Sequence, residues 1–219
     1  MKAIIFDLDE TILNRDLSLL SFLDDQYERF LHLWEHIEKE PFIQRFVELD
    51  ERGNVWKDKV YAQLIEEYKL NASVDELLID YTEQFPHFVI GFPRYKEVLV
   101  ELKEQGFLLG MITNGKKGFQ RENIQGLGIA DIFDVITVSE EVGMKKPDKD
   151  IFEYTLAKLH VVPNEAIFIG DNPINDVEAA FNVGILGVWK RDHLIESYET
   201  RYVIDELDEI FDILHTLNY

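Results

Sequence analysis

The residues best suited to chemistry lie near the start of the chain, where two aspartates follow a short apolar run. Ala3–Phe6 is typical of a buried strand and leads directly into Asp7-Leu8-Asp9-Glu10-Thr11. A chain leaving a strand can turn side chains two positions apart toward one cleft. Two carboxylates placed so closely repel each other unless a proton or a cation intervenes, and a hard ion such as Mg²⁺ suits their oxygens. Taken alone, the segment can also be a plain polar loop.

Three later clusters of polar residues repeat this pattern. Phe107–Ile112 is followed by Thr113-Asn114-Gly115, and Ala166–Ile169 is followed by a run from Gly170-Asp171 to Asp176. Lys145-Lys146-Pro147-Asp148 stands just before an expected helix. Carboxyl ends of parallel strands meet at one sheet edge, so we expect the clusters to gather there. A carboxylate nucleophile, a hydroxyl, a cation and further carboxylates suit phosphoryl transfer, for which an aspartyl phosphate is an accepted route.

Each later cluster also has a simpler interpretation. Thr113-Asn114-Gly115 can be a turn, and Lys146-Pro147 can be a solvated loop. Asp176 can be a residue that the helix dipole stabilises in a first turn. Because the clusters occur together at successive strand ends, we favour the functional interpretation.

The elements that must position these clusters alternate between strands and helices after residue 90. Strands are predicted at Ala3–Phe6, Phe107–Ile112, Val135–Val138, Ala166–Ile169 and Ile185–Trp189, and helices at Arg94–Gln105, Lys117–Gly126, Asp148–Leu159 and Ile174–Val183. Continuous apolar strands separated by helices indicate a parallel sheet buried on both faces. The fold class predicted is α/β, with a doubly wound, Rossmann-like core.

Residues 15–90 break the alternation and predict an inserted helical unit. Helices are expected at Ser18–Glu40, Phe42–Glu51, Val55–Leu70 and Val74–Phe85, with breaks at Pro41, at Gly53-Asn54 and at 71–73. The domains are therefore a catalytic core of residues 1–14 and 91–219 and a helical cap of residues 15–90. An insertion after the first strand of such a fold is expected to act as a lid over the ligand-binding edge.

Composition limits the partners of the protein. The chain has 219 residues, a formal net charge of -21 and no cysteine. Such acidity repels nucleic acid and anionic membranes, and the absence of cysteine excludes disulfides and thiol chemistry. No membrane span or signal peptide is expected, which predicts a cytoplasmic protein, either a monomer or a homodimer.

The order of the motifs resembles a known family. Asp7-x-Asp9-x-Thr11, Thr113, Lys146-Pro147 and Gly170-Asp171 with Asp176 are similar to the four motifs of the haloacid dehalogenase-like hydrolase superfamily. The helical insertion resembles the cap of its first subclass. Details around the second and third motifs are most similar to the small-molecule phosphatases of that subclass: Thr113-Asn114-Gly115 with Gln120, Leu127-Gly128-Ile129, Ser139-Glu140-Glu141 and Lys146-Pro147-Asp148.

The resemblance implies how the carboxylates would act. Asp7 would attack phosphorus, and Asp9 would protonate the leaving alkoxide and then deprotonate the hydrolytic water. Mg²⁺ would be held by the carboxylates of Asp7 and Asp171 and by the main-chain carbonyl of Asp9.

The resemblance also implies roles for the remaining site residues. Thr113 and the catalytic Lys146 would hold the phosphoryl group, with Asn114 assisting through its backbone. Asp176 would orient Lys146, or a water at the metal, without touching phosphorus. The predicted reaction is hydrolysis of a small phosphorylated metabolite, preferably a nucleoside monophosphate or a sugar phosphate.

Several alternatives stay open at this point. A dehalogenase would share Asp7, but a leaving halide needs no acid, so Asp9 favours a phosphate ester. A sugar phosphomutase uses the same pair and differs mainly in how its lid excludes water. A noncatalytic binding or regulatory protein of this fold would have no need of both aspartates.

Two features of the helical insertion have other possible meanings. His32-Leu33-Trp34-Glu35-His36 matches the H-x-x-E-H zinc pattern, with both histidines expected on one helical face, and we interpret it as a helix surface. Substrate contacts from the cap are sought among its aromatic and basic residues, although aromatic residues at helical spacing are more often core. The candidates are Trp34, Phe42, Arg45, Trp56 and Lys57.

Overall fold

The structure, a computed structural model, describes residues 1–34, 36–195 and 197–219. Its chain divides into two compact units. The first, called the core unit, comprises Met1–Asn14 and Ile90–Tyr219, and the second, the helical unit, comprises Arg15–Val89. Within the described residues, no helix is both long enough and apolar enough to cross a lipid bilayer.

The core unit is built on a six-stranded sheet whose strands pair in parallel, in the order β3-β2-β1-β4-β5-β6. β1 lies between β2 and β4, with Phe6 opposite both Met111 and Ile169. The strands are β1 (Ala3–Phe6), β2 (Leu108–Thr113), β3 (Val135–Val138), β4 (Ala166–Gly170), β5 (Leu186–Lys190) and β6 (Val203–Ile204). The predicted α/β class with a doubly wound, Rossmann-like sheet is confirmed.

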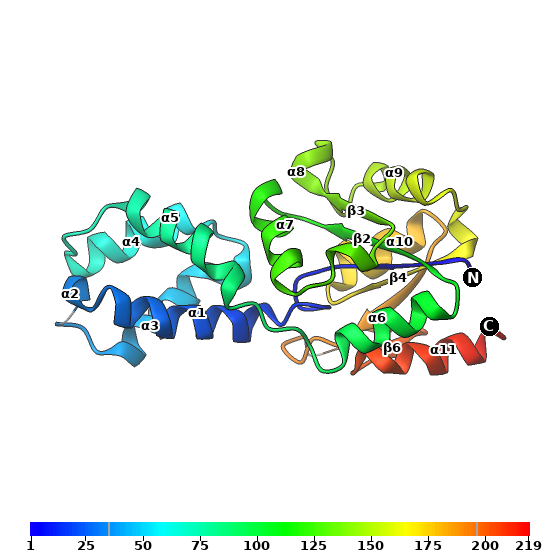
Figure 1. The fold of residues 1–219 in the computed structure, drawn as a ribbon, viewed down its shortest axis with the longest axis horizontal. Coiled ribbons are helices and arrows are strands. Elements are labelled where there is room, and N and C mark those ends of the chain that lie inside the picture. Colours follow the sequence, from blue (N-terminus) through cyan, green and yellow to red (C-terminus); the bar gives the residue numbers. More distant parts are fainter. Residues whose placement is uncertain (35, 196) are drawn as a thin grey trace. The chain divides into compact units, whose positions relative to one another are not determined.

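Helices cover both faces of this sheet, which explains why its strands are apolar throughout. In Figure 1, α6 and α11 lie on one side of the sheet and α9 lies on the other. Ile5, Phe168 and Phe152 of α9 belong to one cluster of fully buried side chains. The helices of the core unit are α6 (Tyr95–Glu104), α7 (Lys117–Gly126), α8 (Ser139–Val142), α9 (Lys149–Leu159), α10 (Ala179–Asn182) and α11 (Ile210–Thr216).

Several elements of the core unit differ from the prediction, and the short helices α8 and α11 were not predicted. The helix expected at Ile174–Val183 is a wide π-type turn, η5 (Pro173–Glu178), that continues into α10. Pro173 starts this turn, and the side chain of Asn172 accepts hydrogen bonds from the amides of Ile174 and Asn175, which caps it. β6 was not predicted, because two residues carry no periodic signal.

The helical unit contains α1 (Arg15–Arg29), α2 (Leu31–Trp34), α3 (Lys39–Asp50), α4 (Lys57–Tyr68) and α5 (Val74–Gln84). The single helix predicted at Ser18–Glu40 is wrong, because α1 ends at Arg29 and α3 begins before Pro41. Pro41 lies in the first turn of α3, where its missing N–H leaves no helical hydrogen bond unmade, so it does not break the helix.

The histidine pair of the H-x-x-E-H pattern is not on one helical face. Because α2 ends at Trp34, His36 lies beyond the helix that contains His32, and its Nε2 lies 3.2 Å from the carbonyl oxygen of Tyr68. Glu35, the third member of the pattern, falls outside the described residues.

The helical unit uses several of the proposed substrate contacts for its own packing. Trp34 and Phe42 are fully buried, and their ring centroids are 4.6 Å apart. Lys57 is buried and paired with Asp50, while Arg45 is paired with Glu67 and Glu48. Of the candidates for substrate contact, Trp34 and Phe42 are therefore core residues of this unit, which is the more common role of aromatic residues at helical spacing.

Candidate active site

The carboxyl edge of the sheet brings the predicted site residues together. Asp7 directly follows β1, and its amide donates to the carbonyl oxygen of Ile169 at 2.9 Å, which continues the ladder of the sheet. Thr113 is the last residue of β2, and Asp171 directly follows β4. Because β2 and β4 flank β1, these side chains come from adjacent strands.

Lys146 lies at the centre of this group of residues. Its Nζ is 2.7 Å from Oδ1 of Asp7 and 2.7 Å from Oδ1 of Asp176. The lysine side chain is 3% exposed and that of Asp176 is 0% exposed, so the ion pairs are shielded from solvent. A lysine from the loop after α8 is thereby bound to carboxylates that follow two different strands.

Backbone contacts hold Lys146 and Asp176 in place. The side chain of Asn114 accepts from the amide of Lys146 and donates to its carbonyl oxygen, both at 2.9 Å. Oδ2 of Asp176 accepts from the amide of Asn172 at 3.0 Å. A Cβ on Gly170 would lie 2.4 Å from the carboxyl group of Asp176, so only glycine leaves room for that carboxylate. Asn114 thus lies in the predicted cluster. Its side chain, rather than its backbone, makes the contacts with Lys146.

Two residues for which the sequence analysis predicted no role also lie at the carboxyl edge of the sheet. Gln120 of α7 donates from Nε2 to Asp9 Oδ2 and to Thr113 Oγ1, both at 2.7 Å. Lys190, the last residue of β5, is buried, with its Nζ 3.4 Å from the centroid of the Phe92 ring. Lys190 shows the same signal as the other clusters, a polar residue at the end of an apolar strand.

The buried carboxylates repel one another strongly. Burial raises the pKa of Asp7, although Lys146 partly offsets this effect. Burial and the charges of Asp7 and Asp176 raise the pKa of Asp171 to about 9. Burial also raises the pKa of Asp176 to about 6, against the opposing effect of Lys146. Burial disfavours the charge of Lys146, but Asp176 and Asp7 outweigh it and raise the lysine pKa above its ordinary value.

This arrangement fits a hard divalent cation. Oxygen atoms of Asp7, Asp171 and Asp176 lie within 4.8 Å of one another. The ammonium of Lys146 contacts Asp7 and Asp176, and the pKa values of all three carboxyl groups are nevertheless raised, so the cluster gains from further protons or a cation. Both oxygens of Asp176 are engaged by Asn172 and Lys146, which leaves Asp7 and Asp171 better placed as ligands.

The raised pKa of Asp171 has a consequence for stability without metal. The carboxyl group of Asp171 binds its proton more tightly in the folded state than in the unfolded state. The folded state therefore loses stability as the pH rises from 3.8, the ordinary pKa of the group, toward about 9. We expect Asp171→Asn to reduce this dependence, to which Asp7 and Asp176 also contribute, and to raise the free energy of unfolding at pH 8 by at least about 2 kcal/mol. Urea unfolding across this pH range, in chelator, measures the effect.

Asp131→Asn is the matched control, because Asp131 is exposed and lies in the turn before β3, whereas the cluster lies at the carboxyl ends of the strands. It should leave the pH dependence unchanged. Equal effects of the two substitutions would show that repulsion within the cluster does not limit stability. Added Mg²⁺ should stabilise the unmodified protein more than Asp171→Asn, since a bound cation favours the ionised carboxylates.

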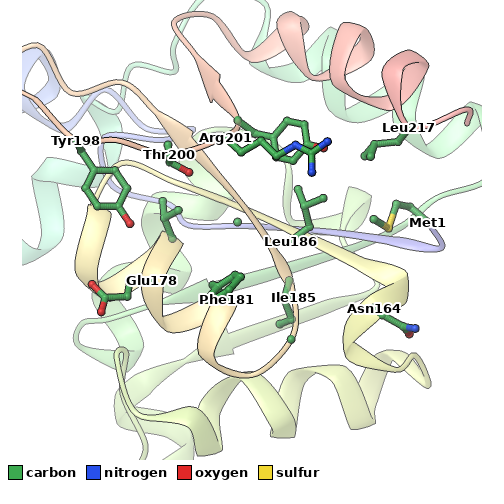
Figure 2. Close-up of a pocket in the computed structure, with 14 residues that line it drawn as sticks. Met1, Asn164, Glu178, Phe181, Ile185, Leu186, Tyr198, Thr200, Arg201 and Leu217 are labelled. Carbon is green, nitrogen blue, oxygen red and sulfur yellow. The ribbon is translucent and has the colours of Figure 1, made fainter.

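A separate hollow in the core unit is not this site. It has a volume of about 630 Å³ and lies between α10 and the segment around residues 198–202. Figure 2 shows Phe181, Leu186 and Tyr198 among its lining side chains. None of the catalytic candidates lines it, so this apolar hollow is distinct from the carboxylate cluster.

Comparison with known proteins agrees with this geometry. The model of the family described as haloacid dehalogenase-like hydrolase matches residues 4–189. The crystal structure of an HAD phosphatase from Thermococcus onnurineus superimposes with a TM-score of 0.69 and 32% identity, covering 98% of each chain. The glyceraldehyde 3-phosphate phosphatase of Pyrococcus furiosus is 28% identical over 100% of this chain and 95% of its own. The phosphoserine phosphatase of Thermus thermophilus is 34% identical over 61% of this chain and 54% of its own.

The chain belongs to the haloacid dehalogenase-like hydrolases. The resemblance inferred from the four motifs is thereby confirmed, as is the prediction of a hydrolytic enzyme. The three relatives are all named as phosphatases, in line with a phosphoric monoester hydrolase.

Proposed function

We propose that this protein is a Mg²⁺-dependent phosphatase of small phosphorylated metabolites that works through an aspartyl phosphate on Asp7. The observation that carries the proposal is the pairing of Lys146 with Asp7 and Asp176, next to Asp171. A nucleophilic carboxylate, a cation for phosphoryl oxygens and a carboxylate pair for a metal are what phosphoryl transfer requires.

In the first step, a carboxylate oxygen of Asp7 forms a bond to phosphorus while the bond from phosphorus to the ester oxygen breaks. Asp9 transfers its proton to that oxygen, so that the product leaves as an alcohol. Lys146 favours the ionised, nucleophilic form of Asp7, as its lowering effect on the carboxyl pKa indicates. The hydroxyl of Thr113 donates to a phosphoryl oxygen.

In the second step, water attacks the phosphorus of the aspartyl phosphate and releases inorganic phosphate. Asp9, now ionised, accepts the proton of that water, and the carboxylate of Asp7 is regenerated. Asp176 is bound to Lys146 and to the amide of Asn172, so it acts by positioning the lysine.

Asp7, Asp171 and the main-chain carbonyl of Asp9 are the groups that would hold Mg²⁺. When bound, the ion neutralises negative charge on the transferring phosphoryl group. The donor set is made of hard oxygens, which Mg²⁺ prefers, and the crowded carboxylates gain from its charge.

The substrate class rests on composition and on the relatives. The strongly acidic surface disfavours polyanions and large anionic partners. Glyceraldehyde 3-phosphate and phosphoserine, which appear in the names of two relatives, are small monoesters. We therefore propose sugar phosphates, including triose phosphates, or nucleoside monophosphates as substrates. The cap role of residues 15–90 and the cytoplasmic location stay predictions.

A panel of phosphate esters tests the proposal. Phosphate release is measured with nucleoside monophosphates, sugar phosphates, triose phosphates and phosphoserine, with Mg²⁺ and after chelation. We expect release from a few of these esters, and a loss of at least about 10²-fold on removal of the metal.

Other outcomes of the panel would change the assignment. Release that persists in chelator would contradict the metal dependence. Isomerisation of a sugar phosphate with little free phosphate would indicate a phosphomutase. No turnover of any ester would favour a noncatalytic binding protein of this fold.

A further inference from the structure

The side chain of Gln120 connects two residues of the proposed mechanism that come from different strands. Its Nε2 lies 2.7 Å from Oδ2 of Asp9 and 2.7 Å from Oγ1 of Thr113. Gln120 is buried in the first half of α7, with 3% of its surface exposed. One amide group thus contacts both the proposed acid–base residue and the proposed phosphoryl-binding hydroxyl.

The orientation of this amide follows from its neighbours. An ionised carboxylate only accepts hydrogen bonds, so the NH₂ group of Gln120 must face Asp9. On its other side, Oε1 accepts from Nδ2 of buried Asn123 at 3.2 Å. A Cβ on Gly115 would lie 2.8 Å from Cγ of Gln120, so the loop after β2 packs directly against the glutamine. The amide is therefore held by contacts at both ends.

This orientation has a chemical consequence for Asp9. The hydroxyl oxygen of a protonated carboxyl group is a weaker acceptor than its carbonyl oxygen, so the hydrogen bond that Gln120 donates to Oδ2 disfavours a proton on that oxygen. The proton that Asp9 transfers is then directed to Oδ1.

The hydrogen bond from Gln120 also determines in which direction the hydroxyl of Thr113 can donate. Its hydroxyl accepts from Gln120, and a hydroxyl that accepts one hydrogen bond can still donate its own hydrogen elsewhere. That hydrogen is then available for an oxygen of the phosphoryl group, which has no hydrogen to donate when ionised.

We propose that Gln120 is a positioning residue, which fixes the proton-carrying oxygen of Asp9 and the donor direction of Thr113 through one amide group. This inference rests on the proposed function and adds to it a residue that does not touch the substrate. It predicts that loss of the amide impairs proton transfer more than phosphoryl transfer as such.

Gln120→Met tests this inference, because methionine has similar length and no hydrogen-bonding amide. Release of the leaving group is followed in a single turnover, with an alkyl phosphate from the panel and with p-nitrophenyl phosphate. The alkyl ester needs a proton on its leaving oxygen, whereas p-nitrophenolate leaves without one. We expect a loss of about tenfold to a hundredfold for the alkyl ester and a smaller loss for the aryl ester.

Two further variants separate positioning from general damage to the fold. Gln125→Met changes an exposed glutamine of the same helix and should leave both rates unchanged. Gln120→Glu keeps the length of the side chain but replaces the donating NH₂ group with a carboxylate that only accepts hydrogen bonds when ionised, so it should lower the alkyl ester rate at least as much as Gln120→Met. Thermal unfolding of each variant checks that the fold is intact.

The possible results distinguish this inference from the function on which it rests. If unmodified protein turns over neither ester, the proposed function fails, and the inference fails with it. If the unmodified protein is active but Gln120→Met lowers both rates equally, or alters neither, Gln120 does not act through Asp9. A change in KM alone would equally contradict the positioning role.

Discussion

Asp7→Asn is expected to lower kcat by at least about 10⁴-fold, whatever ester is used, because the amide cannot form the bond to phosphorus that the carboxylate forms. Its neighbours have other roles: Lys146 is protonated, Asp176 is bound to Lys146 and to Asn172, and Asp171 is the proposed ligand of the metal. The measurement is phosphate release at saturating substrate, with Mg²⁺ present.

The same substitution should not harm the fold. The substitution removes the negative charge of Asp7, which is one of the charges that raise the pKa of Asp171. It therefore weakens the repulsion among the carboxylates of the cluster. Unfolding in chelator should therefore occur at an equal or higher urea concentration than in the unmodified protein. Asp131→Asn, at an exposed position, serves as the control for activity. Substantial residual turnover by Asp7→Asn would refute the assignment of the nucleophile.

Asp9→Asn should lower the rate of the first step by a factor that depends on the leaving group of the ester. General acid catalysis contributes about 10² to 10⁴-fold, so release of an alkyl alcohol in a single turnover should fall by that factor. Release of p-nitrophenolate in a single turnover should fall much less, because that group leaves without a proton. Under steady-state conditions both esters should react slowly, since the second step lacks its base.

The comparison between the two esters makes this prediction specific. If Asp9→Asn cleaves the alkyl phosphate as fast as the unmodified protein does, Asp9 is not the general acid. If it slows both esters equally in the first turnover, Asp9 acts on binding or on phosphoryl transfer itself. Gln120→Met should show the same selectivity with a smaller loss, because it acts through Asp9.

The central strands and the polar residues after them could be predicted from the sequence for a simple reason. β1, β2 and β4 are buried on both faces, so each forms an unbroken apolar run whose end is visible. Polar residues that follow such runs must lie at one edge of a parallel sheet. The placement of Asp7, Thr113 and Asp171 at this edge could therefore be predicted from the sequence pattern, without knowledge of any contact.

Residues that reach the site from elsewhere could not be found in this way. Gln120 lies one turn into α7, and its reach to Asp9 depends on how that helix packs against β2. Lys190 ends an apolar strand and so carries the same signal as the other clusters, but its contact with Phe92 joins residues far apart in the chain and could not be predicted. In the helical unit, the spacing of the aromatic residues did not show that Trp34 and Phe42 pack against each other. The sequence also did not show that Pro41 lies in the first turn of α3.

The most direct test of the account is to trap the phosphoryl group on the enzyme. Asp9→Asn is mixed with p-nitrophenyl phosphate and Mg²⁺, quenched in acid, digested and examined by mass spectrometry. Because the first step needs no acid with this ester and the second step lacks its base, we predict that the peptide containing Asp7 carries a phosphoryl group. Release of p-nitrophenolate with no phosphoryl group on that peptide, or with the group on another residue, would contradict the proposed mechanism.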